Sequence, residues 1–164
     1  MIKIGVIGAG QLGKIHIRLL KEIQEFEFVG FYDSNHKNAQ KIANKFDIES
    51  FQSAEELIEI CDAIDIVTPT KLHFEYAKLV LQKGKHLFVE KPITSTLSEA
   101  KKLMQLSNGR NLKIQVGHVE RFNPAFTAIE NDCKNPMFIE AHRLAEFNPR
   151  STDISVIHDL MIHD

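Results

Sequence analysis

The sequence predicts an α/β fold, a doubly wound parallel sheet that is followed by the start of a second, truncated α/β domain. Three observations predict it. Short runs of β-branched and aromatic residues alternate with segments of helical periodicity as far as Gly117. Such alternation is typical of a parallel sheet with helices on both faces. The first run leads into a glycine-rich turn, and the pattern changes after Gly117.

Each predicted strand is a short apolar run that ends near a polar residue or a proline. Strands of a parallel sheet read as continuous apolar runs because both of their faces are covered. The second run ends at Asp33 and the third at Thr68-Pro69. We expect strands at residues 2–7, 27–32, 63–67, 86–89 and 112–116.

The segments between the strands repeat their apolar residues at helical spacing. Ser53 with Glu56, and Thr96 with Glu99, have the spacing of a capping box, which predicts that a helix begins there. Gly84 stands where a helix terminator belongs. We expect helices over residues 12–23, 39–46 and 72–81, one after Ser53, and one between Thr96 and Gly109.

The remaining residues predict a helix at 123–133, a strand at 138–144 and a helix at 153–164. These elements are too few to bury an independent core. We therefore expect one complete domain at residues 1–118 and the incomplete beginning of a second at residues 119–164.

Composition excludes several classes of protein. The 20 basic and 22 acidic residues give a formal net charge of -2, so no general attraction to nucleic acid or to an acidic membrane is expected. The two cysteines, Cys61 and Cys133, have neither disulfide-framework nor metal-site spacing. The sequence shows no export signal and no apolar stretch of spanning length. We expect a cytoplasmic protein.

The turn at residues 8–13, Gly-Ala-Gly-Gln-Leu-Gly, matches the GxGxxG pattern between a predicted strand and a predicted helix. In that context Gly8 permits the tight turn, Gly10 lets the backbone approach a pyrophosphate, and Gly13 allows close helix–strand packing. The helix start at Gln11 and Leu12 offers N–H groups to phosphates. The alternative is a turn that only packs.

Asp33 lies 20 residues after Gly13, at the end of the second predicted strand. An acidic residue at this position accepts hydrogen bonds from the ribose hydroxyls of NAD and repels the extra phosphate of NADP. Lys37 leaves NADP open as the less favoured cofactor. The alternative for Asp33 is an ordinary turn residue at a strand end.

Several of these motifs occur in the order found in a known family. The glycine turn, Thr68-Pro69 with His73, Glu90-Lys91-Pro92 and the run Asp159 to His163 resemble the Gfo/Idh/MocA oxidoreductases. The resemblance implies an N-terminal Rossmann domain and a C-terminal domain with a large, mostly antiparallel sheet. Family chains are about twice as long, so we expect an N-terminal fragment of a protein that is a homo-oligomer at full length.

The resemblance also implies an activity. Family members oxidise or reduce a hydroxyl or carbonyl carbon of sugars, inositols and nucleotide sugars with NAD or NADP. The segments 117–124, 141–144 and 147–150 are similar to a narrower group, the bacterial UDP-N-acetylglucosamine 3-dehydrogenases. We expect an NAD-dependent dehydrogenase of a nucleotide sugar. The alternatives are a free sugar or inositol as substrate, and a dinucleotide-binding module without catalysis.

Within this family, three residues fit the proton chemistry that accompanies hydride transfer. Lys91 lies just past a strand's carboxyl end, where its ammonium holds the reacting hydroxyl. His163 is the expected base, and Asp159, four residues earlier, orients it from the same helix face. The alternatives are a solvated turn lysine and a surface ion pair.

Further residues have supporting roles. Thr68, Pro69 and Glu90 are expected to contact the cofactor, although Glu90 has the alternative of a solvent-facing carboxylate. His73 is expected to pack at a helix start. The expected sugar or diphosphate contacts, with a hinge salt bridge as the alternative, are His118, Arg121 and Asn123. No metal is expected, because His158 and His163 lie on different helix faces.

Overall fold

The computed structural model describes residues 1–142, 144 and 155–163. These residues form two compact units, Met1–Gly117 and His118–Asp164, which are taken separately below. The motif at residues 147–150 lies outside the described residues.

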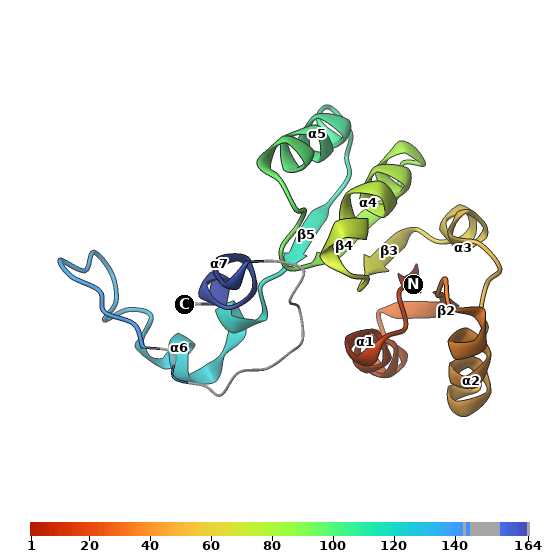
Figure 1. Ribbon diagram of the computed structural model, residues 1–164, viewed down its shortest axis with the longest axis horizontal. Helices are drawn as coiled ribbons and strands as arrows, with labels where there is room; N and C mark the ends of the chain where they lie inside the picture. Colours follow the sequence, from red (N-terminus) through yellow and green to blue (C-terminus); the bar gives the residue numbers. More distant parts are fainter. Residues whose placement is uncertain (143, 145–154, 164) are drawn as a thin grey trace. The chain divides into compact units, whose positions relative to one another are not determined.

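The first unit is built on one sheet of five parallel strands in the order β2-β1-β3-β4-β5 (Figure 1). The strand order reverses between β1 and β3, and ligands bind at such a switch point in open α/β sheets. The strands are β1 (Ile2–Ile7), β2 (Phe26–Tyr32), β3 (Ala63–Ile66), β4 (His86–Glu90) and β5 (Ile114–Gly117).

Helices connect the strands and cover the sheet on both faces. They are α1 (Gln11–Glu22), α2 (His36–Phe46), α3 (Ala54–Ile60), the short 3-10 turn η1 (Thr70–Leu72), α4 (His73–Gln82) and α5 (Leu97–Ser107). The doubly wound parallel sheet predicted from the sequence is therefore confirmed.

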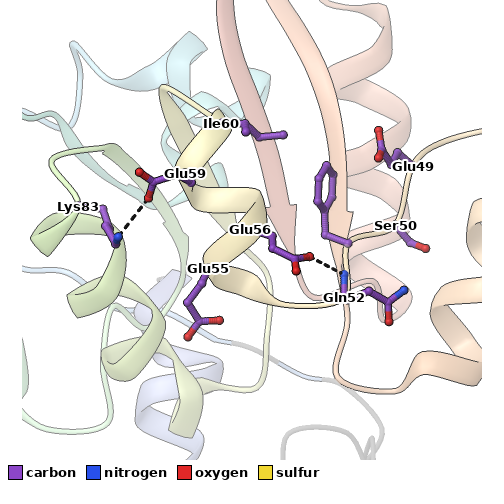
Figure 2. Close-up of a pocket in the computed structure, with 9 residues that line it drawn as sticks. Glu49, Ser50, Gln52, Glu55, Glu56, Glu59, Ile60 and Lys83 are labelled. Atoms are coloured by element: carbon purple, nitrogen blue, oxygen red, sulfur yellow. Dashed lines mark hydrogen bonds and ion pairs between the residues drawn. The ribbon is translucent and has the colours of Figure 1, made fainter.

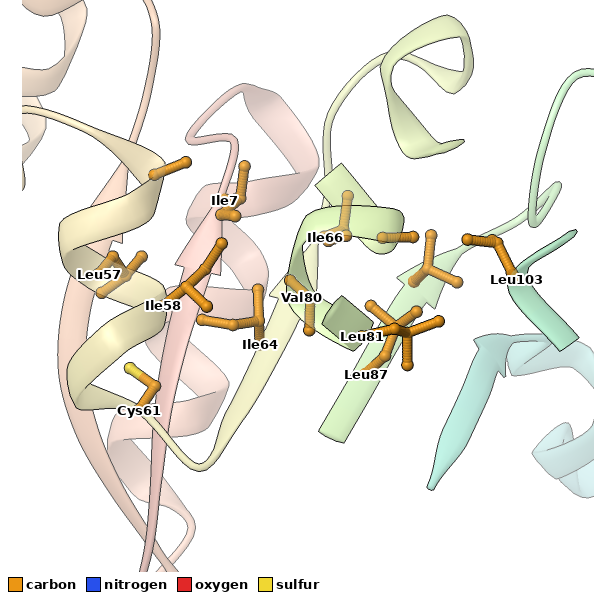
Figure 3. Packing of buried hydrophobic residues seen from close by; sticks show 13 residues of the cluster. Ile7, Leu57, Ile58, Cys61, Ile64, Ile66, Val80, Leu81, Leu87 and Leu103 are labelled. Atoms are coloured by element: carbon orange, nitrogen blue, oxygen red, sulfur yellow. The ribbon is translucent and has the colours of Figure 1, made fainter. Parts of the chain in front are cut away.

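Strand alternation divides the core into two layers. Side chains of one parity, such as Ile64 and Ile66, pack under α3, α4 and α5 with Leu57, Val80 and Leu103 (Figure 3). Side chains of the other parity, such as Ile4 and Val6, pack under α1 and α2. Asp65 and Glu90 have this second parity, which becomes important for the site.

The residues predicted to begin or end helices do so in the structure. The Ser53 side chain accepts a hydrogen bond from the Glu56 amide at the start of α3. Thr96 and Glu99 form both hydrogen bonds of a capping box at α5. Gly84 adopts a left-handed φ of 71° directly after α4.

The second unit contains short helical segments and differs from the prediction. These are η2 (Val119–Phe122), α6 (Pro124–Ile129), α7 (Val156–Asp159) and η3 (Met161–His163). The helix predicted at 123–133 ends at Ile129, so its predicted length is wrong.

The strand predicted at 138–144 is also wrong, because residues 138–142 and 144 form no strand. Alternating apolar residues need a neighbouring strand to supply backbone hydrogen bonds, and the described part of this unit provides none. The helix predicted at 153–164 is interrupted between α7 and η3, and its residues 153, 154 and 164 lie outside the description.

Among the residues described, no helix combines the length and the apolar character needed to cross a membrane.

Candidate functional site

The glycine turn joins β1 to α1, and its three glycines meet different surroundings. Gly8 has a left-handed φ of 99°, and a Cβ there would lie 2.7 Å from the Val67 carbonyl oxygen. A Cβ on Gly13 would overlap the Gly8 carbonyl oxygen. A Cβ on Gly10 would meet nothing within 4 Å. Packing therefore requires Gly8 and Gly13, whereas Gly10 leaves open space beside the turn.

Gly10 is also the N-cap of α1, so no side chain caps the helix start. The first hydrogen bond of the helix runs from the Lys14 amide to the Gly10 carbonyl oxygen at 3.2 Å. N–H groups of a first turn have no acceptor within the helix, and they carry the positive end of its dipole. Gln11 and Leu12 form this first turn, and Leu12 is 44% exposed. The helix start thus faces the open space with the polarity that suits an anion.

Asp33 follows β2 and holds the glycine turn. One carboxylate oxygen accepts the Ala9 amide at 2.8 Å, and the other accepts the Asn35 amide at 2.8 Å. The side-chain amide of Asn38 donates to the Ala9 carbonyl oxygen at 3.3 Å. Because each carboxylate oxygen has two lone pairs, Asp33 keeps acceptor capacity after these bonds.

A cavity of about 130 Å³ lies at the carboxyl ends of β1, β2 and β3. The Thr68 hydroxyl oxygen is buried and has no hydrogen-bond partner among the described residues. Buried polar atoms rarely stay without a partner, so this hydroxyl fits a site that a polar ligand completes. The cavity is lined by Ile7, Gly8, Gly10, Tyr32, Asp33, Ser34, Val67, Thr68, Pro69, Leu72 and Tyr76.

These features match the groups of a dinucleotide. The turn has room over Gly10, a helix start beside it, a carboxylate at the end of β2 and an unsatisfied hydroxyl after β3. The first two suit a pyrophosphate, and the carboxylate suits ribose hydroxyls. The residues present therefore fit the cofactor that the sequence predicts.

His73 ties two of the connecting turns together. It is 1% exposed, and its ring nitrogens lie 2.8 Å from the carbonyl oxygens of Pro92 and Thr68. The ring thus joins the turn after β3 to the turn after β4. This buried packing position agrees with the sequence expectation for His73.

Lys91 directly follows β4, and its backbone amide donates to a Glu90 carboxylate oxygen at 3.1 Å. The other Glu90 oxygen lies 3.4 Å from Nε2 of His16 on α1. The Glu90 side chain is only 14% exposed, so the alternative of a solvent-facing carboxylate is wrong.

The sequence analysis missed His16 and Asp65. Nδ1 of His16 lies 2.8 Å from the carboxylate of Asp65, which is 3% exposed in the middle of β3. A signal for this pair existed in the sequence. Asp65 interrupts the apolar strand Ala63–Ile66, and a carboxylate in a buried strand requires a partner.

The electrostatics of this cluster follow from burial and pairing. Burial alone would lower the pKa of His16, but its hydrogen bonds to Asp65 and Glu90 outweigh burial and raise it from 6.5 to about 9. Burial raises the pKa of Asp65, although the His16 bond opposes the shift. Burial would also raise the pKa of Glu90, but His16 and the Lys91 amide lower it. His16 is therefore an imidazolium at neutral pH, between two carboxylates.

The second unit brings several other predicted residues together. A cavity of about 380 Å³ within it is lined by His118, Glu120, Arg121, Phe126, Ile162 and His163. Asn123 does not line it, because its side chain caps α6 through the Ala125 amide and donates to Glu120.

Asp159 and His163 do not share one continuous α-helix. Asp159 ends α7, and His163 ends η3, where its backbone amide donates a hydrogen bond to the Leu160 carbonyl oxygen at 3.0 Å. The expected placement on one α-helical face is therefore wrong, since the spacing rule assumes an unbroken helix.

A larger cavity of the first unit lies elsewhere, between α3 and the segment that follows α2 (Figure 2). It holds about 640 Å³ and is lined by four glutamates, with Lys83 paired to Glu59 at 3.1 Å. This acidic surface is unsuited to phosphates and contains none of the predicted site residues. Within the described part of the chain, no three His, Cys, Asp or Glu side chains form a group that could hold a metal.

Comparison with known proteins identifies the family. Residues 2–118 match the family GFO_IDH_MocA, an oxidoreductase family with an NAD-binding Rossmann fold. UDP-N-acetylglucosamine 3-dehydrogenase of Acidithiobacillus ferrooxidans is 39% identical over 164 residues, which are 99% of this chain and 52% of that protein. The chain spans about half the length of the curated relatives it matches.

Solved structures show the same likeness. The structure of that UDP-N-acetylglucosamine 3-dehydrogenase, GnnA, superposes with a TM-score of 0.91 and covers 99% of this chain and 53% of its own. Scyllo-inositol dehydrogenase of Lactobacillus casei, solved with NAD(H) and scyllo-inositol, is 28% identical with a TM-score of 0.73, over 80% of this chain and 40% of its own. Since the family match covers most of the sequence, this chain belongs to the Gfo/Idh/MocA family of oxidoreductases, through an NAD-binding Rossmann domain.

Proposed function

We propose that this chain forms the cofactor-binding part of an NAD-dependent dehydrogenase that oxidises a ring hydroxyl of a nucleotide sugar. The observation that carries the proposal is the open space over Gly10, at the uncapped start of α1 and next to Asp33. Packing of the turn does not require a glycine at this position.

Asp33 favours NAD over NADP in this proposal. Its carboxylate lines the cavity and retains acceptor capacity for the two ribose hydroxyls. A ribose phosphate would meet a negative charge there. Thr68 and Pro69, which line the same cavity, would contact the adenosine half.

The chemistry divides between cofactor and protein. NAD supplies the hydride acceptor when it is bound. The Lys91 ammonium would hold the reacting hydroxyl oxygen and favour its loss of a proton, from the turn at the carboxyl end of β4. His163 would accept that proton, and Asp159 remains the residue proposed to support it.

A nucleotide sugar is the preferred substrate because of the cavity in the second unit. Arg121 and His118 line it together with His163. A guanidinium binds phosphate oxygens with two parallel hydrogen bonds, which suits a diphosphate better than a free sugar. The relative of 39% identity is named for UDP-N-acetylglucosamine, which agrees with this substrate class.

The Lys91→Ala variant of the complete gene product tests the proposal. We expect turnover of UDP-N-acetylglucosamine, followed as NADH formation, to fall at least about 100-fold, the usual size of a proton-transfer contribution. The dissociation constant of NAD should stay within about twofold. Lys101→Ala, an exposed lysine on α5, is the matched control and should behave as wild type.

Two other results would change the proposal. Turnover of Lys91→Ala within a few-fold of wild type would remove Lys91 from the reaction. Tight NAD binding by the wild-type protein without turnover of any sugar or inositol would favour a dinucleotide-binding module without catalysis.

A further inference from the structure

A charged cluster lies beneath the site, on the sheet face that α1 covers. Asp65 stands between Ile64 and Ile66 in β3, so its carboxylate enters the layer under α1 and α2, whose buried members are mostly apolar. His16 reaches it from α1 at 2.8 Å, and its other ring nitrogen lies 3.4 Å from Glu90. The His16 ring thus links α1 to both β3 and β4.

Stability alone does not explain this cluster. Replacing a buried ion pair by apolar side chains is often neutral or stabilising, because burial of charges is costly. One oxygen of Asp65 even remains buried without a hydrogen-bond partner among the described residues. A group that is retained at such a cost calls for a role beyond packing.

The contacts of Glu90 indicate that role. One of its carboxylate oxygens faces His16, and the other accepts the backbone amide of Lys91. On the neighbouring strand, a Cβ at Gly117 would lie 2.5 Å from the Glu90 carboxylate, so the absence of a side chain there leaves room for it. The ring of Phe88 packs edge-on against His16, with centroids 6.0 Å apart.

We propose that His16 is a positioning residue: it ties Asp65 to Glu90 and, through Glu90, holds the backbone of Lys91 at the edge of the cofactor site. The proposal rests on the function proposed above for its link to catalysis, but the contact chain is independent of that function. The charged groups that face the imidazole are Asp65 from β3 and Glu90 from β4, and Lys91 is the cation next to Glu90.

The contact chain is tested by NMR titration of the isotope-labelled chain, which needs no turnover. We expect the amide proton shift of Lys91 to follow the titration of the His16 imidazole. In His16→Gln this titration should vanish, and amide exchange of Lys91 should accelerate about tenfold, as for the loss of one hydrogen bond. Glutamine can reach one carboxylate but cannot bridge both with a positive charge.

Two further variants keep the test decisive. Glu90→Gln retains the His16–Asp65 bond, so the imidazole should still titrate while the Lys91 amide no longer responds. His86→Gln is the matched control, because His86 accepts the Lys113 amide at the opposite end of β4. It should leave the Lys91 amide unchanged. An amide of Lys91 that ignores His16 in the wild-type chain would overturn the proposal.

Steady-state kinetics of the complete gene product then test whether the contact chain affects catalysis. We expect kcat of His16→Gln to fall about tenfold, with NAD affinity within about twofold, and the double variant with Glu90→Gln to be no slower than either single variant. Losses that multiply in the double variant, or an unchanged kcat in an active enzyme, would overturn the positioning role. An inactive wild-type protein would instead refute the proposed function, while the NMR result would still decide the contact chain.

Discussion

Gly10 and Gly13 lie three residues apart in the same turn, yet the space that a side chain would meet differs between them. At Gly13 the backbone of the turn itself occupies the space that a Cβ would need. At Gly10 nothing within 4 Å occupies that space. The sequence pattern predicts both glycines, but only the structure separates the one that packing requires from the one that we propose a ligand requires.

The Gly10→Val variant follows from this difference. We expect the dissociation constant of NAD to rise at least about tenfold, because the side chain fills the space for the pyrophosphate. The free energy of unfolding should change by less than about 1 kcal/mol, since the new side chain meets no protein atom near its Cβ. Calorimetric NAD binding and thermal unfolding measure the two quantities.

Gly13→Ala is the control, with the opposite balance. Its Cβ would overlap the Gly8 carbonyl oxygen, so we expect a loss of stability of about 1–3 kcal/mol. Equal destabilisation by both variants would show that the space over Gly10 is needed for folding and is not a ligand site.

Asp33 is the second residue whose role is testable on its own. We expect Asp33→Asn to bind NAD more weakly and NADP more tightly, because the negative charge beside the ribose is removed. The ratio of NAD affinity to NADP affinity should fall at least about tenfold. Titration of both cofactors, followed by calorimetry, measures the ratio.

Asp62→Asn provides a matched control for Asp33. Asp62 also accepts a backbone amide, that of Lys3 at 2.9 Å, but it lies at the amino end of β3. Asp62→Asn should leave the ratio of NAD affinity to NADP affinity unchanged. If Asp33→Asn also leaves that ratio unchanged, Asp33 has no part in binding the ribose and only holds the turn.

At the scale of elements, the Rossmann strands and helices were predictable because local signals and packing agree. Thr96 with Glu99 starts α5, and a left-handed Gly84 ends α4. The strand expected at 138–144 had only alternation to support it, and alternation cannot supply a hydrogen-bonded neighbour. Asp65 in an apolar strand signals that a partner is needed, but that partner, His16, lies 49 positions away, so no local pattern identifies it.

The bond between α1 and β3 makes stability depend on pH. The pKa of His16 is raised from 6.5 to about 9, so its contribution is fully present below pH 6.5 and is lost as pH rises through about 9. We expect the wild-type chain to lose at most about 3 kcal/mol of unfolding free energy over that range.

Urea unfolding at several pH values measures this dependence. In His16→Gln the free energy of unfolding should change much less between pH 6.5 and 9, because no imidazolium is left to lose its proton. A variant with the same slope as wild type would mean that other groups cause the pH dependence.

At the scale of the whole molecule, the residues proposed for the cofactor and those proposed for the substrate lie in different units. The turn, Asp33 and Lys91 belong to the first unit, whereas Arg121 and His163 belong to the second. The family resemblance in the sequence predicts the same division. The geometry within each unit could not be predicted, because it depends on contacts between residues far apart in the chain.

The most direct test of the central claim is a crystal structure of this chain with NAD bound. We predict the pyrophosphate over Gly10 at the start of α1, the ribose hydroxyls on Asp33, and the nicotinamide on the side of Lys91. A dinucleotide bound away from the glycine turn, or one whose nicotinamide lies remote from Lys91, would contradict the claim.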